Sequence, residues 1–87
     1  MGTMIVRLKV KDYGAWRQAF DASKPRRETD GFSNERIFRS TEDGNELMLL
    51  MDASDLKKAK EFAASADRKA AMERNGVVGT PTDYFIE

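Results

Sequence analysis

Aromatic side chains at helical spacing are the first feature of this sequence that could serve chemistry. Tyr13, Trp16 and Phe20 follow one another at three- and four-residue intervals, which places them on one face of a helix. Such a stripe forms either the wall of a pocket for an aromatic ligand or ordinary core packing, because large aromatic side chains dominate small cores. Both interpretations hold together if the core is incompletely filled.

Arginines on predicted strands form a second group with chemical potential. Arg7, Arg36 and Arg39 flank apolar strand positions, and an arginine facing a cavity can bind a carboxylate or a phenolate through its planar fork. Arg7 is the most notable, because a charge on a central strand needs a partner. The alternative is a solvated edge or an ion pair across neighbouring strands, for which the acidic candidates are Glu35, Glu46 and Asp83.

Flexible and amphipathic side chains complete the predicted site. Met48, Met51 and Met72 are soft fillers that shape an adaptable pocket or simply fill a core. Tyr84 could donate a hydrogen bond into a cavity or to a partner subunit. The predicted ligand-contacting residues are Arg7, Tyr13, Trp16, Phe20, Arg36, Met48, Phe62 and Tyr84.

Composition excludes several kinds of site. The 87 residues include neither histidine nor cysteine, which removes disulfides, thiol nucleophiles, a Ser-His-Asp triad and the usual metal ligands. The acidic residues show no metal-loop spacing. We therefore expect no metal and no cofactor, and no residue is singled out as catalytic, so enzymatic activity stays an open question. The lack of cysteine is compatible with a reducing cytoplasm, which is the location we expect.

Charge and hydropathy argue against two classes of partner. The 15 basic and 15 acidic residues cancel, so no overall field attracts nucleic acid. The short basic run of Lys24, Arg26 and Arg27 is therefore predicted to be a solvated face rather than a phosphate contact. No stretch approaches the roughly 20 apolar residues of a membrane span.

Alternating and helical patterns predict the elements that would position these residues. A half-buried strand begins the chain, with Met4, Val6, Leu8 and Val10 on its apolar face, and Asp12 then caps the aromatic helix. That helix ends or kinks near Lys24, before Pro25. The remaining predicted elements are a continuation to Asp30, a strand over 32–40, a polar turn over 41–45, a strand over 46–52, helices capped by Ser54 or Asp55 and by Ser65, and a last strand over 82–86.

The order of these elements is β-α-β-β-α-β, which is the ferredoxin-like arrangement of an α+β fold. We expect residues 1–87 to form one domain. Right-handed crossovers place the helical segments on one face of a four-stranded antiparallel sheet, with the first and third strands in the middle.

The third predicted strand carries apolar side chains on both faces. Met48 and Leu50 point one way, whereas Leu47, Leu49 and Met51 point the other. Helices can cover only one of these faces. Leaving a few hundred Å² of apolar sheet exposed forgoes several kcal/mol at about 25 cal/mol per Å², so we expect the open face to pack against a second copy in a two-fold homodimer.

Several segments together resemble a known family. They are the helix Asp12-Tyr13-x-x-Trp16-x-x-x-Phe20-Asp21, the segment from Arg36 through Glu46 into the apolar strand, and the stretches Asp55-Leu56-x-x-Ala59-x-x-Phe62 and Met72-x-x-x-Gly76-Val77 with Pro81. These resemble the dimeric α+β-barrel superfamily, close to small proteins of the antibiotic biosynthesis monooxygenase type. The resemblance covers nearly the whole chain and implies a homodimer with a ligand cavity in each subunit, between sheet and helices.

Members of this family differ in activity, so the resemblance implies more than one possible function. Some members oxygenate polycyclic phenols without metal or flavin, and others degrade haem with a histidine ligand that this chain lacks. Close relatives often have a histidine about where Ser23 stands here. We predict a small dimeric protein that binds an aromatic or apolar ligand; the alternative is a cofactor-independent monooxygenase of aromatic polyketide-like phenols, with Arg7, Tyr13, Trp16 and Arg36 as donors. A structural dimer without a ligand is a third possibility.

Overall fold

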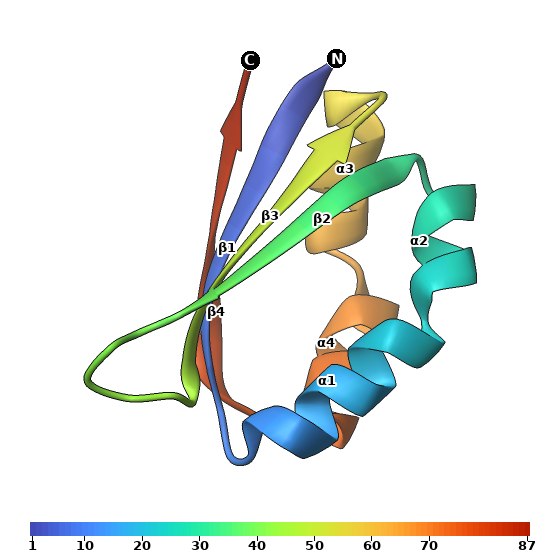
Figure 1. Ribbon diagram of the computed structural model, residues 1–87. Helices are drawn as coiled ribbons and strands as arrows, with labels where there is room; N and C mark the ends of the chain where they lie inside the picture. Colours follow the sequence, from blue (N-terminus) through green and yellow to red (C-terminus); the bar gives the residue numbers. More distant parts are fainter.

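The computed structural model describes residues 1–87 as one antiparallel sheet with all helices on the same face (Figure 1). The strand order is β2-β3-β1-β4, so the first and third strands are central, as predicted. This confirms the ferredoxin-like α+β arrangement. The elements are β1 (Gly2–Val10), α1 (Tyr13–Ala22), α2 (Lys24–Thr29), β2 (Phe32–Arg39), β3 (Glu46–Ala53), α3 (Leu56–Ala63), α4 (Ala66–Arg74) and β4 (Val77–Ile86).

Strand alternation divides the sheet into a buried face and an open face. On β3, Leu47, Leu49 and Met51 are buried beneath the helices, whereas Met48 is exposed on the other side. The predicted two-sided character of this strand is confirmed. The buried core consists of Met4, Val6, Leu8, Val10, Trp16, Phe32, Leu47, Leu49, Met51, Ala53 and Ala59.

Each longer helix begins at a side-chain cap, where a short polar side chain accepts from amides that lack a helical partner. Asp12 accepts from the amide of Gly14 at 3.1 Å. Asp55 accepts from Lys57 and Lys58 at 3.0 and 3.3 Å. Ser65 caps α4, as the sequence predicted.

The break between α1 and α2 also follows the prediction. The first helix ends at Ala22, and Pro25 lies in the first turn of the next, where a missing amide hydrogen costs nothing. Gly31 ends this helical stretch with a φ of +89°. A Cβ built on Gly31 would lie 2.5 Å from the Ser54 hydroxyl oxygen, so both conformation and space favour glycine here.

Two strands differ from the predicted pattern. The last strand was expected at 82–86 but begins at Val77, because β4 is an edge strand and an edge tolerates Pro81 within it. In β2, a register shift between Ser33 and Arg36 turns Phe32 into the core while Phe38 lies on the open face. Strict alternation along residues 32–38 would place Phe32 and Phe38 on one face, but one extra residue in β2 reverses the alternation.

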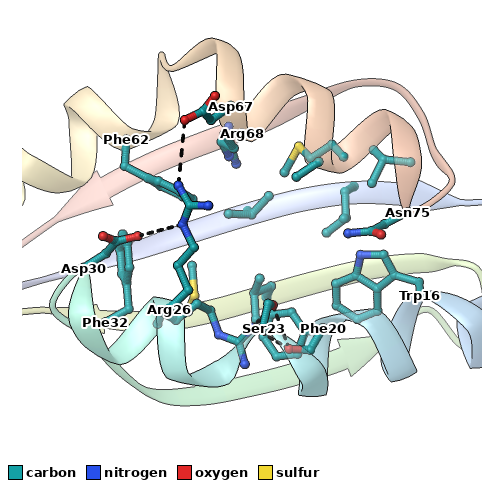
Figure 2. Close-up of a pocket in the computed structure, with 18 of the residues that line it drawn as sticks. Trp16, Phe20, Ser23, Arg26, Asp30, Phe32, Phe62, Asp67, Arg68 and Asn75 are labelled. Atoms are coloured by element: carbon teal, nitrogen blue, oxygen red, sulfur yellow. Dashed lines mark hydrogen bonds and ion pairs between the residues drawn. The ribbon is translucent and has the colours of Figure 1, made fainter.

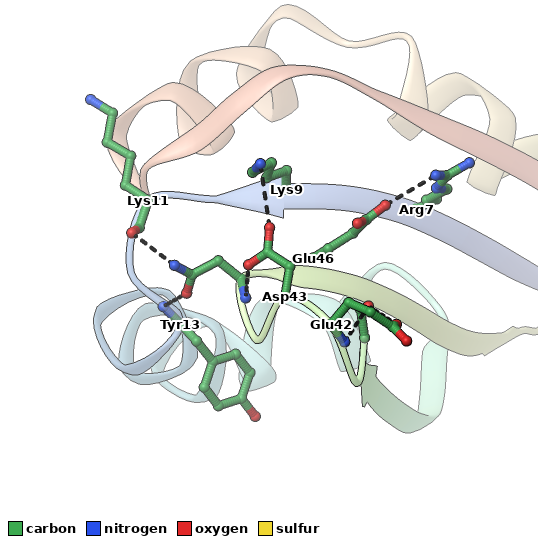
Figure 3. A network of polar contacts seen from close by, with 9 residues as sticks. Arg7, Lys9, Lys11, Tyr13, Glu42, Asp43 and Glu46 are labelled. Atoms are coloured by element: carbon green, nitrogen blue, oxygen red, sulfur yellow. Dashed lines mark hydrogen bonds and ion pairs between the residues drawn. The ribbon is translucent and has the colours of Figure 1, made fainter.

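A polar network fixes the β2–β3 turn against the start of α1 (Figure 3). The Asn45 side-chain oxygen accepts from the amide of Tyr13 at 2.9 Å, and its amide nitrogen donates to the Lys11 carbonyl at 3.3 Å. Asp43 accepts from the amide of Asn45 at 3.0 Å and pairs with Lys9 at 3.3 Å. These contacts set the height of α1 above the sheet, and α1 carries the aromatic stripe.

The open face of the sheet carries large apolar side chains without cover. Cross-strand neighbours in the register share a face, so Met48, Phe38 and Arg7 are adjacent, as are Ile5 and Tyr84. The exposed apolar side chains of the open face are Phe38, Met48, Val78, Tyr84 and Ile86.

None of the helices is both long and apolar enough to cross a membrane.

Candidate functional site

A cavity of about 410 Å³ lies between the sheet and the helices (Figure 2). Its floor is the buried face of β1 and β3, its walls come from α1 and α2 on one side and α3 and α4 on the other, and Val77 of β4 also borders it. Twelve of its 20 lining residues are hydrophobic, so the cavity suits a largely apolar molecule.

Four aromatic rings border the cavity, those of Trp16, Phe20, Phe32 and Phe62. Trp16 and Phe20 stack with ring centroids 4.9 Å apart and an interplanar angle of 22°. Phe32 and Phe62 meet edge to face at 5.4 Å and 61°. Trp16 and Phe32 are only 5% and 2% exposed, so a ligand could contact only the parts of these rings that border the cavity.

Two polar groups of the cavity wall have free hydrogen-bonding capacity. Trp16 and Asn75 both line the cavity, and no hydrogen bond joins the indole N–H or the Asn75 side-chain amide to another protein group. Figure 2 shows the nitrogen-bearing edge of the indole turned toward Asn75. Together they could hold one ligand oxygen at the α1–α4 side of the cavity.

Arg68 of α4 is buried in the wall that α3 and α4 form, and both of its terminal nitrogens are paired. Its side chain is 8% exposed, and its two terminal nitrogens donate to the carboxylate of Asp83 at 2.7 Å each. It also donates to the carbonyl of Ala63 at 3.2 Å. This bidentate pair joins α4 to β4 and holds the cavity wall in place.

Arg27 of α2 is also buried, contrary to the prediction of a solvated face for the basic run. Its guanidinium lies 3.6 Å from the centroid of the Phe20 ring and reaches Glu35 at 3.5 Å. Burial lowers the pKa of the Arg27 guanidinium below its ordinary value, while the charge of Glu35 opposes this shift. The prediction failed because α2 packs its inner face on β2, which a run of charges does not reveal.

Arg26 reaches across the rim of the cavity (Figure 2). Its side chain pairs with Asp30, at the C-terminal end of α2, at 3.9 Å and with Asp67 of α4 at 3.8 Å. These long contacts between exposed side chains contribute little stability. They nevertheless place a breakable link between the two helical walls.

Three of the predicted site residues meet in the cavity. Trp16, Phe20 and Phe62 all line it. Tyr13 stays outside: its ring lies 6.2 Å from Trp16, under the guanidinium of Arg39 at 3.9 Å. The aromatic stripe is thus part core and part cavity wall.

The other four predicted residues lie on the open face. Arg7, Arg36, Met48 and Tyr84 cannot reach the cavity, because their strand positions send the side chains to the uncovered side. Placing them between sheet and helices was therefore wrong. Arg7 pairs with Glu46 at 3.0 Å, one of the pairs anticipated from the sequence.

The open face has a hollow of its own. Arg7 and Met48 line a shallow depression of about 240 Å³ together with Phe38. Arg36 lies further along this face and pairs with Asp52 at 2.9 Å. These side chains form a surface rather than an enclosed site.

Two of the cavity-side residues that were not predicted, Arg27 and Asp83, could have been recognised from the sequence. Arg27 follows Phe20 by seven residues and Ser23 by four, which is the spacing of one helical face. Asp83 lies between Pro81 and Phe85 on the helix side of β4, and an acid on an inward position requires a buried cation such as Arg68. Asn75 carries no such signal, since it reads as an ordinary helix end. No three acidic side chains gather closely enough to hold a metal ion.

Solved structures with the same fold share low sequence identity with this chain. A Bordetella bronchiseptica protein, provisionally assigned as an antibiotic biosynthesis monooxygenase, gives a TM-score of 0.77 at 16% identity, covering 100% of this chain and 97% of its own. A Caulobacter crescentus protein with the same provisional assignment gives 0.70 at 15%, covering 98% and 86%. SnoaB from Streptomyces nogalater, a cofactor-independent oxygenase, gives 0.68 at 13%, covering 95% and 89%.

These likenesses confirm the fold that the resemblance predicted, that of proteins of the antibiotic biosynthesis monooxygenase type. No family model and no curated protein matches the sequence.

Proposed function

We propose that this chain, which shares its fold with antibiotic biosynthesis monooxygenase-type proteins, binds a small aromatic or apolar ligand in the helix–sheet cavity. The observation that carries the proposal is an apolar cavity of about 410 Å³ walled by the stacked rings of Trp16 and Phe20. Ligand sites are typically concave, mostly apolar and supplied with a few polar groups, and Asn75 and Trp16 provide such groups. We take residues 1–87 as one domain with a cytoplasmic location.

The single tryptophan makes the proposal testable. Because Trp16 is the only tryptophan, a ligand that stacks in the cavity changes the intrinsic fluorescence directly. We expect titration with 2-naphthol to change this fluorescence saturably. Ala71→Phe, which fills the cavity from α4, should abolish the saturable change, whereas Ala15→Phe on the exposed side of α1 should not. Equal binding by both variants would contradict the proposal.

A homodimer through the open face belongs to the same proposal. The apolar side chains of Phe38, Met48 and Tyr84 lie uncovered on that face, and a two-fold contact between two such faces would bury them. We expect light scattering to give twice the chain mass at micromolar concentration, and Phe38→Asp to give the monomer. Ala15→Asp, on the helix side, should remain dimeric. A monomeric wild-type protein under these conditions would refute the assembly.

Cofactor-independent oxygenation is the second candidate, favoured by the unpaired donors at the cavity wall. The substrate loses its acidic proton to water, and the resulting electron-rich phenolate or enolate gives electrons to dioxygen as a carbon–oxygen bond forms. The peroxide then takes up a proton, and the hydroperoxide loses water as its O–O bond and the C–H bond at the same carbon break, which leaves a ketone. The Trp16 N–H and the Asn75 amide could stabilise the negative oxygen during these steps. A general base would come from the substrate or from solvent.

Oxygen uptake with anthrone distinguishes the two candidates. If the cavity is catalytic, Trp16→Phe and Asn75→Ala should each lower the rate by about tenfold or more, since each removes a donor to developing charge. Arg36→Ala lies on the open face and serves as the matched control. Equal rates in all of these proteins, or no uptake above the buffer rate, would leave only the binding function.

A further inference from the structure

Two buried arginines border the cavity, and their pairing differs sharply. Arg68 has both terminal nitrogens on Asp83 at 2.7 Å. Arg27 has only a 3.5 Å contact with Glu35, which is longer than an ordinary charge-assisted hydrogen bond. Arg68 is therefore a neutralised structural link, whereas Arg27 is a buried cation with a weak counter-charge.

One edge of the Arg27 guanidinium lacks a good acceptor. Its Nη1 is occupied, since it donates to the Phe20 carbonyl and to the Ser23 hydroxyl. Its Nε is buried and has no partner, and its Nη2 makes only the long contact with Glu35. Nε and Nη2 together are a side of the planar fork that matches the two oxygens of a carboxylate.

The other carboxylates near the cavity are engaged elsewhere. Asp83 neutralises Arg68, and Asp30 and Asp67 lie beside Arg26 at the rim, so Glu35 is the only carboxylate that contacts Arg27. A buried donor without an acceptor is unfavourable, so an incoming acceptor gains more here than at the surface. The stacked face of Phe20 under Arg27 holds the guanidinium plane in position.

We propose that Arg27 is the residue that recognises an aromatic carboxylate, with the ligand's ring among Trp16, Phe20 and Phe62 and its carboxylate on the Nε–Nη2 edge. This inference rests on the proposed ligand-binding function and names the class of ligand. Since Nε is closed to solvent, binding requires the Arg27 side chain to rotate until this edge faces the ligand, and that rotation breaks the contact with Glu35. Glu35 is thus the internal competitor of the ligand.

Calorimetric titration with two matched probes tests this assignment. Naphthalene-2-carboxylate and naphthalene-2-carboxamide have nearly the same shape, so their difference isolates the charge. In the wild-type protein we expect the carboxylate to bind about tenfold tighter, the size of a charged hydrogen bond. Arg27→Gln should remove this preference while the carboxamide still binds. Glu35→Gln should strengthen binding of the carboxylate alone.

The outcomes separate this inference from the function on which it rests. Equal affinity of the wild-type protein for the two probes, or a Glu35→Gln protein with unchanged carboxylate affinity, overturns the role of Arg27 and leaves the cavity as a site for neutral aromatics. Failure of both probes to bind the wild-type protein overturns the ligand cavity as well. Arg36→Gln on the open face should keep the full preference, and its loss there would also count against Arg27.

Discussion

Removing Asp83 should destabilise the protein strongly, because it leaves Arg68 buried without a counter-charge. The Arg68 side chain is 8% exposed, and Asp83→Ala deletes the acceptor of both 2.7 Å bonds. Only the 3.2 Å bond to the Ala63 carbonyl remains. A guanidinium in this place cannot recover its water without opening the contact between α4 and β4.

The expected loss is a large share of the total stability. Breaking a buried ion pair by removing one partner costs about 3–5 kcal/mol. We expect about 3 kcal/mol, the lower end, because Asp83 is 19% exposed and some water can enter. A chain of 87 residues has a free energy of unfolding of roughly 4–13 kcal/mol, so the variant approaches the limit of folding.

Urea unfolding followed by circular dichroism at one fixed protein concentration measures this loss. Asp21→Ala is the matched control, because it breaks an exposed arginine–aspartate pair of 3.0 Å on α1 and should cost at most about 0.5 kcal/mol. Adding Arg68→Met to Asp83→Ala should restore part of the stability, since the unpaired charge disappears. A loss below about 1 kcal/mol for Asp83→Ala, or no recovery in the double variant, would refute the reasoning.

Further predictions concern a cap, a glycine, the rim contact and one titration. Asp55→Ala should cost about 1 kcal/mol in urea unfolding, because two amides of α3 lose their acceptor, and a loss no larger than that of an exposed substitution would be evidence against the cap. Gly31→Ala should cost roughly 1–2 kcal/mol in the same assay, because its φ is +89°, and an unchanged midpoint would contradict this. Arg26→Ala should speed ligand dissociation in stopped-flow fluorescence without reducing stability, and an unchanged rate would show that the rim contact controls nothing. The pKa of the Asp43 carboxyl lies below its usual range, chiefly because the carboxylate accepts from the Asn45 amide and secondly because it pairs with Lys9. The stability that this carboxylate adds is fully present at a pH above the ordinary pKa of an aspartate and is lost as the pH falls through the lowered pKa of the folded protein. An NMR titration that gives an ordinary pKa for Asp43 would refute this.

The fold could be predicted from the sequence because its local signals agree with one another. Strand alternation, the capping residues Asp12 and Ser65 and the break at Pro25 each specify a local conformation, and one topology satisfies them all. Two details escaped. The bulge in β2 depends on the pairing of Ser33 with β3, and the extension of β4 depends on its place at the edge of the sheet. Both are properties of the assembled sheet and have no local signal.

The site was harder to predict, because a residue's type does not specify the face on which it lies. Arg7 was singled out for being a charge on a central strand, but solvent reaches it, since nothing in the chain covers that face. Arg27 was judged by its charged neighbours, although its spacing from Phe20 places it on the packed side of the helix. In both cases the tertiary environment reversed the expectation from residue type.

The strand β3 links the cavity to the proposed assembly. A chain of this size buries only about 60–65% of its unfolded surface, and an unfilled space above Leu49 reduces what its core contributes. The other side of the same strand carries Met48, whose exposure would be ended by a partner sheet. Burial of apolar surface that the cavity removes from the core on the helix side of β3 could thus be regained on the open side of the same strand, where a partner sheet would cover Met48. On this reasoning the cavity and the proposed dimer depend on each other, since a chain that kept its open face in water would need a filled core for its stability.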